Sequence, residues 1–174
     1  MVTMNQHITL RPWQECDAPA LYRYASDPDV GSRAGWQPHQ SEEESRDIIR
    51  TVFNNDTTWA IVLKDDTNTP IGAIGYGPSC DCSLPARAEE PTVGYWIGKP
   101  YWNKGYCTEA LRMVIEHARR QGIPSLISGH YTDNPASGRV MEKCGFVPTG
   151  EVCFDTEHPT DAHRPIRVLR ITLQ

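Results

Sequence analysis

The stretch that decides the fold is Thr92–Ala110, with the sequence TVGYWIGKPYWNKGYCTEA. Its first six residues are typical of a strand, and a helical pattern of apolar residues begins at Thr108. The loop between them contains Lys104 and Gly105. Because N–H groups at a helix N-terminus are unpaired and the helix dipole is positive there, this turn can bind an anion such as a phosphate. The same pattern also fits an ordinary turn between a strand and a helix.

Two common nucleotide-binding motifs are absent from this stretch. The P-loop requires G-x-x-x-x-G-K-[ST], but Gly98-Lys99 is followed by Pro100, and Val93 stands where the first glycine belongs. The dinucleotide fingerprint G-x-G-x-x-G does not occur, and the nearest glycines upstream have the wrong spacing. Mononucleotide-binding and dinucleotide-binding folds are therefore poor candidates.

The segments on either side predict a fold of mixed helices and strands. Helices are predicted over residues 18–26, 41–54, 108–121 and 134–145. Strands are predicted over residues 7–13, 59–64, 71–76, 92–97, 126–132, 147–154 and 166–173. Hairpins come first, a strand–helix–strand–helix segment follows, and a last hairpin ends the chain. We therefore expect one α+β domain over residues 1–174, with a mixed, mostly antiparallel sheet of about seven strands and about four flanking helices.

Local signals set the ends of the predicted helices. Ser41 is followed three residues later by Glu44, which is the pattern of a capping box. The segment Asp27–Asp29, which contains a proline, is expected to close the first helix. Asn134 or Ser137 is expected to cap the last helix.

Composition excludes several classes of protein. The chain has 174 residues, with 17 basic against 22 acidic side chains and a net charge of −5, so we expect no nucleic-acid partner. Its longest apolar run, Trp59–Leu63, is far shorter than the roughly 20 residues of a membrane helix, and the N-terminus lacks the apolar core of a signal peptide. The six cysteines are dispersed, which favours reduced thiols in a cytoplasmic protein.

Three segments carry a resemblance to a known family. They are ITLRPW (residues 8–13), GYWIGKPYWNKGYCTEAL (residues 94–111) and NPASGRVMEKCGF (residues 134–146). They are similar to the opening strand, the strand–pyrophosphate-loop–helix segment and the second signature of the GNAT N-acetyltransferase superfamily. The chain most resembles the branch that contains the ribosomal-protein N-terminal acetyltransferases. The resemblance covers about residues 8–173, and the two signatures in this order make it specific.

The resemblance implies the GNAT fold and a direct transfer of an acetyl group from acetyl-CoA to a primary amine. That amine would be a protein N-terminal α-amine or a small-molecule amine. The backbone of Tyr95, Trp96 and Ile97 would bind the pantetheine arm of acetyl-CoA, and the Asn134 side chain would bond to its amides. The residues that would hold the pyrophosphate are Trp102, Asn103, Lys104, Gly105, Tyr106, Cys107 and Thr108.

Two departures from the family pattern affect the expected chemistry. Cys107 replaces a small residue beside the phosphates, and Met141 stands where many members carry a tyrosine that acts as general acid. Ser137 is then the nearest hydroxyl that can stabilise the departing thiolate. Glu90, just before the strand at residues 92–97, is a candidate base, although a base acting through water, or no base, satisfies the chemistry equally well.

The acceptor is less well defined by the sequence. Trp36 lies in a region that the family uses for acceptor selection, so we expect it to line the substrate site, and the net charge favours a cationic acceptor. We expect no metal and no membrane partner, and either a monomer or a homodimer. Two alternatives stay open: a CoA-binding regulatory module without turnover, and an acyltransferase that uses a longer acyl-CoA.

Overall fold

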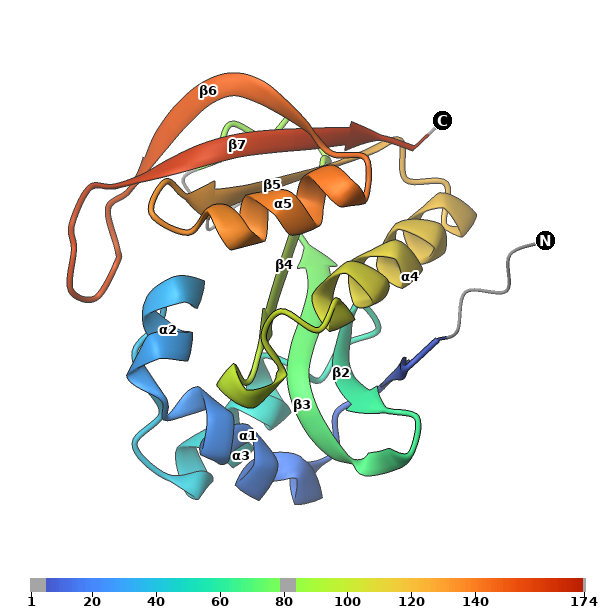
Figure 1. The fold of residues 1–174 in the computed structure, drawn as a ribbon, viewed down its shortest axis with the longest axis vertical. Helices are drawn as coiled ribbons and strands as arrows, with labels where there is room; N and C mark the ends of the chain where they lie inside the picture. Colours follow the sequence, from blue (N-terminus) through green and yellow to red (C-terminus); the bar gives the residue numbers. More distant parts are fainter. Residues whose placement is uncertain (1–5, 79–83, 174) are drawn as a thin grey trace.

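The structure is a computed structural model that describes residues 6–78 and 84–173 (Figure 1). The strands are β1 (Ile8–Arg11), β2 (Thr58–Leu63), β3 (Asp66–Gly77), β4 (Thr92–Ile97), β5 (Ser125–Tyr131), β6 (Val147–Asp155) and β7 (Arg164–Thr172). The α-helices are α1 (Ala18–Ala25), α2 (Pro28–Ala34), α3 (Glu42–Thr51), α4 (Tyr106–Arg120) and α5 (Pro135–Lys143). Two short 3-10 helices are η1 (Glu15–Asp17) and η3 (Lys99–Tyr101).

The strands form one mixed sheet in the order β1-β2-β3-β4-β5-β7-β6. All neighbouring pairs are antiparallel except β4 and β5, which are parallel and are connected through α4. This confirms the predicted α+β class, with a mostly antiparallel seven-stranded sheet and a parallel step across the helix after residue 105.

Helices cover both faces of the sheet because its strands are apolar on both sides. Ile61 and Ile74 pack with α4 and α5 in the larger core cluster. Their neighbours in sequence, Ala60 and Ala73, point the opposite way and pack with α1 and α3 in the smaller cluster. This alternation follows from the two-residue period of a strand.

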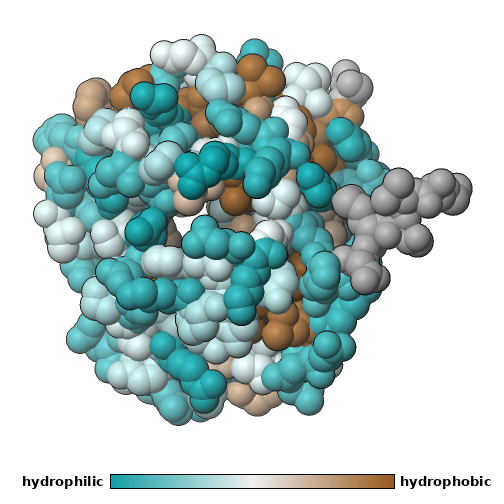
Figure 2. Space-filling view, in the orientation of Figure 1, coloured by the Kyte–Doolittle hydropathy of each residue, from teal (hydrophilic) through white to brown (hydrophobic). Residues whose placement is uncertain are grey.

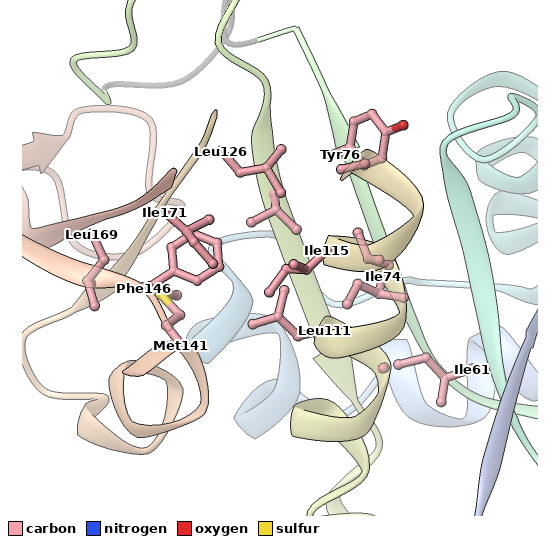
Figure 3. Packing of buried hydrophobic residues seen from close by; sticks show 14 of the residues in the cluster. Ile61, Ile74, Tyr76, Leu111, Ile115, Leu126, Met141, Phe146, Leu169 and Ile171 are labelled. Atoms are coloured by element: carbon pink, nitrogen blue, oxygen red, sulfur yellow. The ribbon is translucent and has the colours of Figure 1, made fainter. Parts of the chain in front are cut away.

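The larger core holds α4 against the sheet and against α5. Leu111 and Ile115 are one turn apart on α4 and are at most 4% exposed. Figure 3 shows them between Ile74 on one side and the Met141–Phe146 pair on the other. This packing fixes the N-terminus of α4 relative to β4 and α5, which matters for the site.

The helix α2 was not predicted from the sequence. The Asp-Pro pair does end α1, as expected, but it also starts a second helix. Asp27 is the N-cap and accepts a hydrogen bond from the N–H of Asp29, and Pro28 occupies the first helical position, where its fixed φ angle fits. Gly35 ends the helix with φ +87°. The sheet is therefore flanked by five α-helices in the described residues rather than about four.

The predicted cap of α3 is confirmed at Ser41, although the Glu44 carboxylate accepts from the Gln40 N–H instead of the Ser41 N–H of a capping box, and the predicted cap of α5 is wrong in part. The Ser41 hydroxyl accepts a hydrogen bond from the Glu44 N–H at 3.1 Å. Asn134 is the N-cap residue of α5, but neither its side chain nor that of Ser137 caps the helix. Both side chains therefore remain available for other contacts.

Within the ranges 6–78 and 84–173, none of the helices combines the length and the apolar character needed to cross a bilayer.

Candidate active site

The strands β4 and β5 separate soon after they meet. Thr92 and Ile127 form their registered pair, and the Ser128 hydroxyl donates a hydrogen bond to the Val93 carbonyl at 2.8 Å. Beyond this point the strands diverge, as Figure 1 shows, and among the described residues β4 has no registered partner on its β5 side up to Ile97. An extended ligand can pair with a strand that is left open in this way.

The N-terminus of α4 faces this opening. Gly105 is the N-cap with φ +81°, a conformation that favours glycine, and no side chain caps the helix. The first intrahelical bond runs from the Glu109 N–H to the Gly105 carbonyl at 3.0 Å. The N–H groups of the first turn, before Glu109, therefore have no partner within the helix and can bind an anion.

A first cavity of about 390 Å³ runs along this edge of β4 to the start of α4. Most residues that the sequence assigned to acetyl-CoA line it, although they come from three separate elements. They are Tyr95, Trp96, Ile97, Trp102, Asn103, Gly105, Tyr106, Cys107, Thr108 and Asn134, and Ser137, expected to act on the thiolate, lines the cavity with them. An unpaired strand edge for amides and a helix start for phosphates fit the two chemical parts of CoA.

Lys104 is the exception among the predicted phosphate-binding residues. It does not line the first cavity; its Nζ lies 5.6 Å from the centroid of the Tyr101 ring, and the side chain borders a separate groove along α4. The cationic side chains that line the first cavity are Arg33, Arg139 and Lys143. Sequence reasoning missed them, although the i, i+4 spacing of the last two along α5 was a usable signal.

Arg33 connects α2 to the loop before α4. Its guanidinium lies 4.7 Å from the centroid of the Trp102 ring, and its Nη1 is 3.5 Å from Asn134 Oδ1. Asn134 is buried, with 8% of its surface exposed. Arg33 therefore joins α2, the loop and the start of α5 around the first cavity.

Tyr95 and Ser137 form a pair of hydroxyl groups at the inner end of this cavity. The Tyr95 hydroxyl donates a hydrogen bond to the Ser137 carbonyl at 2.9 Å and lies 3.0 Å from Ser137 Oγ. Burial raises the pKa of Tyr95, so the phenol stays protonated at neutral pH. Met141 is buried at 1% exposure, as a thioether side chain in the core should be. The side chain of Tyr95 was not anticipated from the sequence, which assigned only its backbone.

A second cavity of about 820 Å³ meets the first at the same pair. The residues common to both cavities are Arg33, Ala34, Tyr95, Asn134 and Ser137. The second cavity continues between the diverging strands to His130, Asp155 and Glu157. In the orientation of Figure 1, Figure 2 shows a hollow left of the centre with a mostly hydrophilic rim, in the part of the view where α2 faces α5.

The carboxylate of Asp155 is held in place at the far wall of the second cavity. Asp155 Oδ2 accepts a hydrogen bond from the Tyr131 hydroxyl at 2.6 Å, and Oδ1 accepts one from the Glu157 N–H at 2.9 Å. Burial and this hydrogen bond raise the pKa of Tyr131, and the Arg164 guanidinium covers the same ring at 3.9 Å. The wall therefore has a fixed negative group.

Glu90, the candidate base of the sequence analysis, does not line either of the two cavities. Its carboxylate pairs with Arg170 at 2.8 Å and accepts a hydrogen bond from the Ser125 hydroxyl at 2.7 Å. Burial by itself would raise the pKa of Glu90, but the bonds from Arg170, from the Arg87 N–H and from Ser125 lower it overall. A carboxylate stabilised in its charged form is a poor proton acceptor.

Glu90→Gln should therefore reduce stability and leave turnover nearly unchanged. Breaking a buried ion pair costs about 3 kcal/mol of unfolding free energy, and urea denaturation at pH 7 measures it. Because the pKa of Glu90 is lowered in the folded protein, its contribution is present above the ordinary carboxyl pKa and is lost as the pH falls through the folded value. The gap between wild type and variant should shrink in acid. If Glu90→Gln instead kept a normal melting temperature and lost most of its kcat, Glu90 would have a catalytic role.

Trp36 also differs from the sequence prediction. Among the described residues that line the two cavities, Trp36 is absent. Its ring instead stacks edge-on against Trp96 at 5.8 Å between centroids and packs with the smaller core cluster. Since Trp96 itself lines the first cavity, Trp36 packs against a residue of the cavity wall without lining the cavity.

Cys107 lines the first cavity, but its thiol is not a reactive nucleophile. Burial raises the pKa of its thiol to about 12, so the sulfur stays a neutral thiol at physiological pH. The Cys144 thiol donates a hydrogen bond to the Thr108 carbonyl at 3.4 Å, and its pKa is also raised by burial. Neither thiol has the low pKa that nucleophilic catalysis requires. Over the described ranges, histidines, cysteines and carboxylates do not gather in groups of three or more that could hold a metal ion.

The sheet splits between two parallel strands, with a helix start suited to phosphates on one side and an open cavity on the other, and this arrangement is that of the GNAT fold. Comparison with known families leads to the same class. The family model described as "Acetyltransferase (GNAT) domain" matches residues 7–147, and the chain belongs to this family. It is an N-acetyltransferase that uses acetyl-CoA.

Individual relatives are distant. The chain is 26% identical over 152 residues to the uncharacterized N-acetyltransferase YoaA of Bacillus subtilis, covering 84% of this chain and 82% of that protein. It is 25% identical over 116 residues to the ribosomal-protein-serine acetyltransferase of Escherichia coli, covering 64% and 61%.

Solved structures resemble this one in fold. A GNAT-family acetyltransferase from Bacillus anthracis has a TM-score of 0.79 at 20% identity, covering 97% of this chain and 96% of that one. Spermidine N-acetyltransferase from Vibrio cholerae, solved with CoA and spermine, has a TM-score of 0.76 at 15% identity, covering 97% of both chains. At these identities the likeness concerns the fold, and it confirms the GNAT fold expected from the sequence.

Proposed function

We propose that this protein transfers the acetyl group of acetyl-CoA directly to a primary amine that carries a further positive charge. Such an acceptor is a polyamine or the α-amine of a basic peptide. The observation that carries the proposal is the meeting of two cavities at Tyr95 and Ser137, one with the chemistry for CoA and the other bordered by carboxylates.

The first cavity supports acetyl-CoA as co-substrate. In this proposal the open edge of β4 at Tyr95–Ile97 binds the amides of the pantetheine arm, together with the buried Asn134 side chain. The start of α4 at Gly105 binds the pyrophosphate, and Arg139 and Lys143 supply the positive charge. When bound, acetyl-CoA supplies an activated thioester.

The second cavity supports a cationic acceptor. Asp155 and Glu157 border it and can pair with a second ammonium group. The net charge of −5 attracts cations over a longer range. Spermine, a polycation, is bound in the Vibrio cholerae structure of the same fold, whereas the match to the ribosomal-protein-serine acetyltransferase favours a protein α-amine.

Ser137 stabilises the leaving thiolate in this proposal. Its hydroxyl lies where the cavities meet and does not cap the helix, so it can donate a hydrogen bond to the sulfur as the C–S bond breaks. The Tyr95 hydroxyl holds this turn by donating to the Ser137 carbonyl, and the Ser137 hydroxyl exchanges its contact with the Tyr95 oxygen for one with the sulfur. Cys16, Cys107 and Cys144 are free thiols, which fits the cytoplasmic location that we also propose.

An acceptor panel with CoA release as the readout tests the proposal. Spermine, spermidine and peptides with a basic second residue should give a kcat/KM at least tenfold above that of benzylamine, which has no second charge. Glu157→Gln should reduce this preference. Glu151→Gln, which removes an exposed carboxylate on β6 that does not line the cavity, should leave it unchanged.

The panel also separates the alternatives. Tight acetyl-CoA binding with no CoA release for any amine would identify a regulatory module instead of an enzyme. Faster release from a longer acyl-CoA would identify a different donor, and a preference for benzylamine would contradict the cationic acceptor.

A further inference from the structure

His130 on β5 lies opposite Tyr95 where the sheet opens. Thr92 on β4 and Ile127 on β5 are registered partners in the parallel pair. Tyr95 lies three residues after Thr92, and His130 lies three residues after Ile127. Because side chains alternate along a strand, these two point to the same face of the sheet. That face carries α5, where Tyr95 contacts Ser137 and His130 contacts the next residue, Gly138.

Gly138 provides the space that the imidazole occupies. A Cβ atom at this position would lie 2.5 Å from His130 Nε2 and 3.0 Å from two ring carbons, so a larger residue here would displace the imidazole. The ring therefore packs directly against the turn of α5 that contains Ser137. His130 is half-buried and lines the second cavity together with Tyr95 and Ser137.

The hydrogen bonding of His130 sets its tautomer. Nδ1 lies 2.9 Å from the Tyr131 carbonyl oxygen, and a carbonyl can only accept, so Nδ1 carries the proton in the neutral ring. Nε2 then carries the lone pair. Within residues 6–78 and 84–173 Nε2 makes no hydrogen bond, so it is available to a ligand in the cavity.

Other proton acceptors near the site are less suitable. Glu90 is paired with Arg170 outside both cavities. Asp155 uses both oxygens within its own wall, for the Tyr131 hydroxyl and the Glu157 N–H. Of the described groups that line the second cavity, His130 combines a free lone pair with direct contact to the Ser137 turn.

We propose that His130 is the general base of the acetyl transfer. As the amine nitrogen forms its bond to the carbonyl carbon of the thioester, Nε2 takes the proton that the nitrogen loses. The C–S bond then breaks, the electron pair leaves with the sulfur, and the imidazolium returns the proton to the thiolate through solvent, giving the amide and free CoA. The inference rests on the proposed entry of the amine through the second cavity.

Two variants of His130 test this role. His130→Gln keeps the size and polarity of the side chain but cannot accept a proton, so kcat should fall about a hundredfold. The affinity for acetyl-CoA, measured by calorimetry, should stay the same because His130 does not line the first cavity. His130→Ala should lose a similar factor and recover at least tenfold when imidazole is added, because the vacated space beside Gly138 can hold the free base.

His163→Asn is the matched control. His163 is exposed in the hairpin loop between β6 and β7, with φ +69°, which asparagine tolerates. It should keep the wild-type kcat and show no response to imidazole. A normal kcat in His130→Gln, or a loss in His130→Ala that imidazole does not restore, would overturn the proposal. A wild-type protein that acetylates no amine would instead refute the proposed function.

Discussion

Gly105→Val is expected to abolish measurable acetyl-CoA binding while the protein stays folded. At φ +81° a β-branched residue is strained by about 1–3 kcal/mol, and relief of that strain turns the first-turn N–H groups of α4 away from a bound pyrophosphate. A Cβ at this position would meet no protein atom within 4 Å, so the added side chain stands in the space that the ligand needs. Isothermal titration calorimetry measures the loss.

Gly122 offers a matched control at the other end of the same helix. It has φ +73°, and a Cβ there would also meet no atom within 4 Å. Gly122→Val should therefore cost a similar amount of stability but bind acetyl-CoA like the wild type. Unchanged affinity in Gly105→Val would remove the phosphate-binding role of this turn, and an equal loss in both variants would point to a general disturbance of α4.

Ser137→Ala should lower kcat by roughly ten- to a hundredfold, with little change in acetyl-CoA affinity. A hydrogen bond to a charged group is worth about 1.5–3 kcal/mol, and the charge on the sulfur develops only as the thiolate leaves. Loss of a helix cap is not an alternative explanation, because the Ser137 hydroxyl caps nothing and instead lies 3.0 Å from the Tyr95 hydroxyl. Steady-state kinetics and a melting curve measure the two effects separately.

Tyr95→Phe identifies which hydroxyl serves the thiolate. If Ser137 is the donor and Tyr95 orients it, the phenylalanine variant should lose less than Ser137→Ala, and the double variant should lose no more than Ser137→Ala alone. A larger loss in Tyr95→Phe would make the phenol the donor. Normal turnover in Ser137→Ala with a lowered melting temperature would leave Ser137 a structural role only.

The fold could be predicted from the sequence to the extent that its signals are local. Periodicity located all seven strands, and the pattern around Gly105 identified the turn that faces the first cavity. The helix α2 was missed because an Asp-Pro pair that closes one helix is also a good start for the next.

The errors in the site have a different physical origin, since they concern contacts between residues far apart in the sequence. Glu90 was a candidate base, and nothing local in the sequence reveals Arg170, its partner eighty residues later. Lys104 was assigned to the phosphates from its place in the loop, but the side chain lies against Tyr101. His130 was treated as a strand residue because its significance depends on the divergence of β4 and β5.

The shared wall between the two cavities has a kinetic consequence. The two cavities meet at Tyr95 and Ser137, and burial keeps the neighbouring Cys107 thiol protonated. Cys107 is therefore not suited to carry the acetyl group as a covalent intermediate between donor and acceptor. The proposed direct transfer requires both substrates in one ternary complex, so we expect initial-rate plots to intersect rather than run parallel. Free CoA shares the pyrophosphate and the pantetheine arm with acetyl-CoA, so we expect it to compete for the first cavity and the rate to depend on the ratio of acetyl-CoA to CoA.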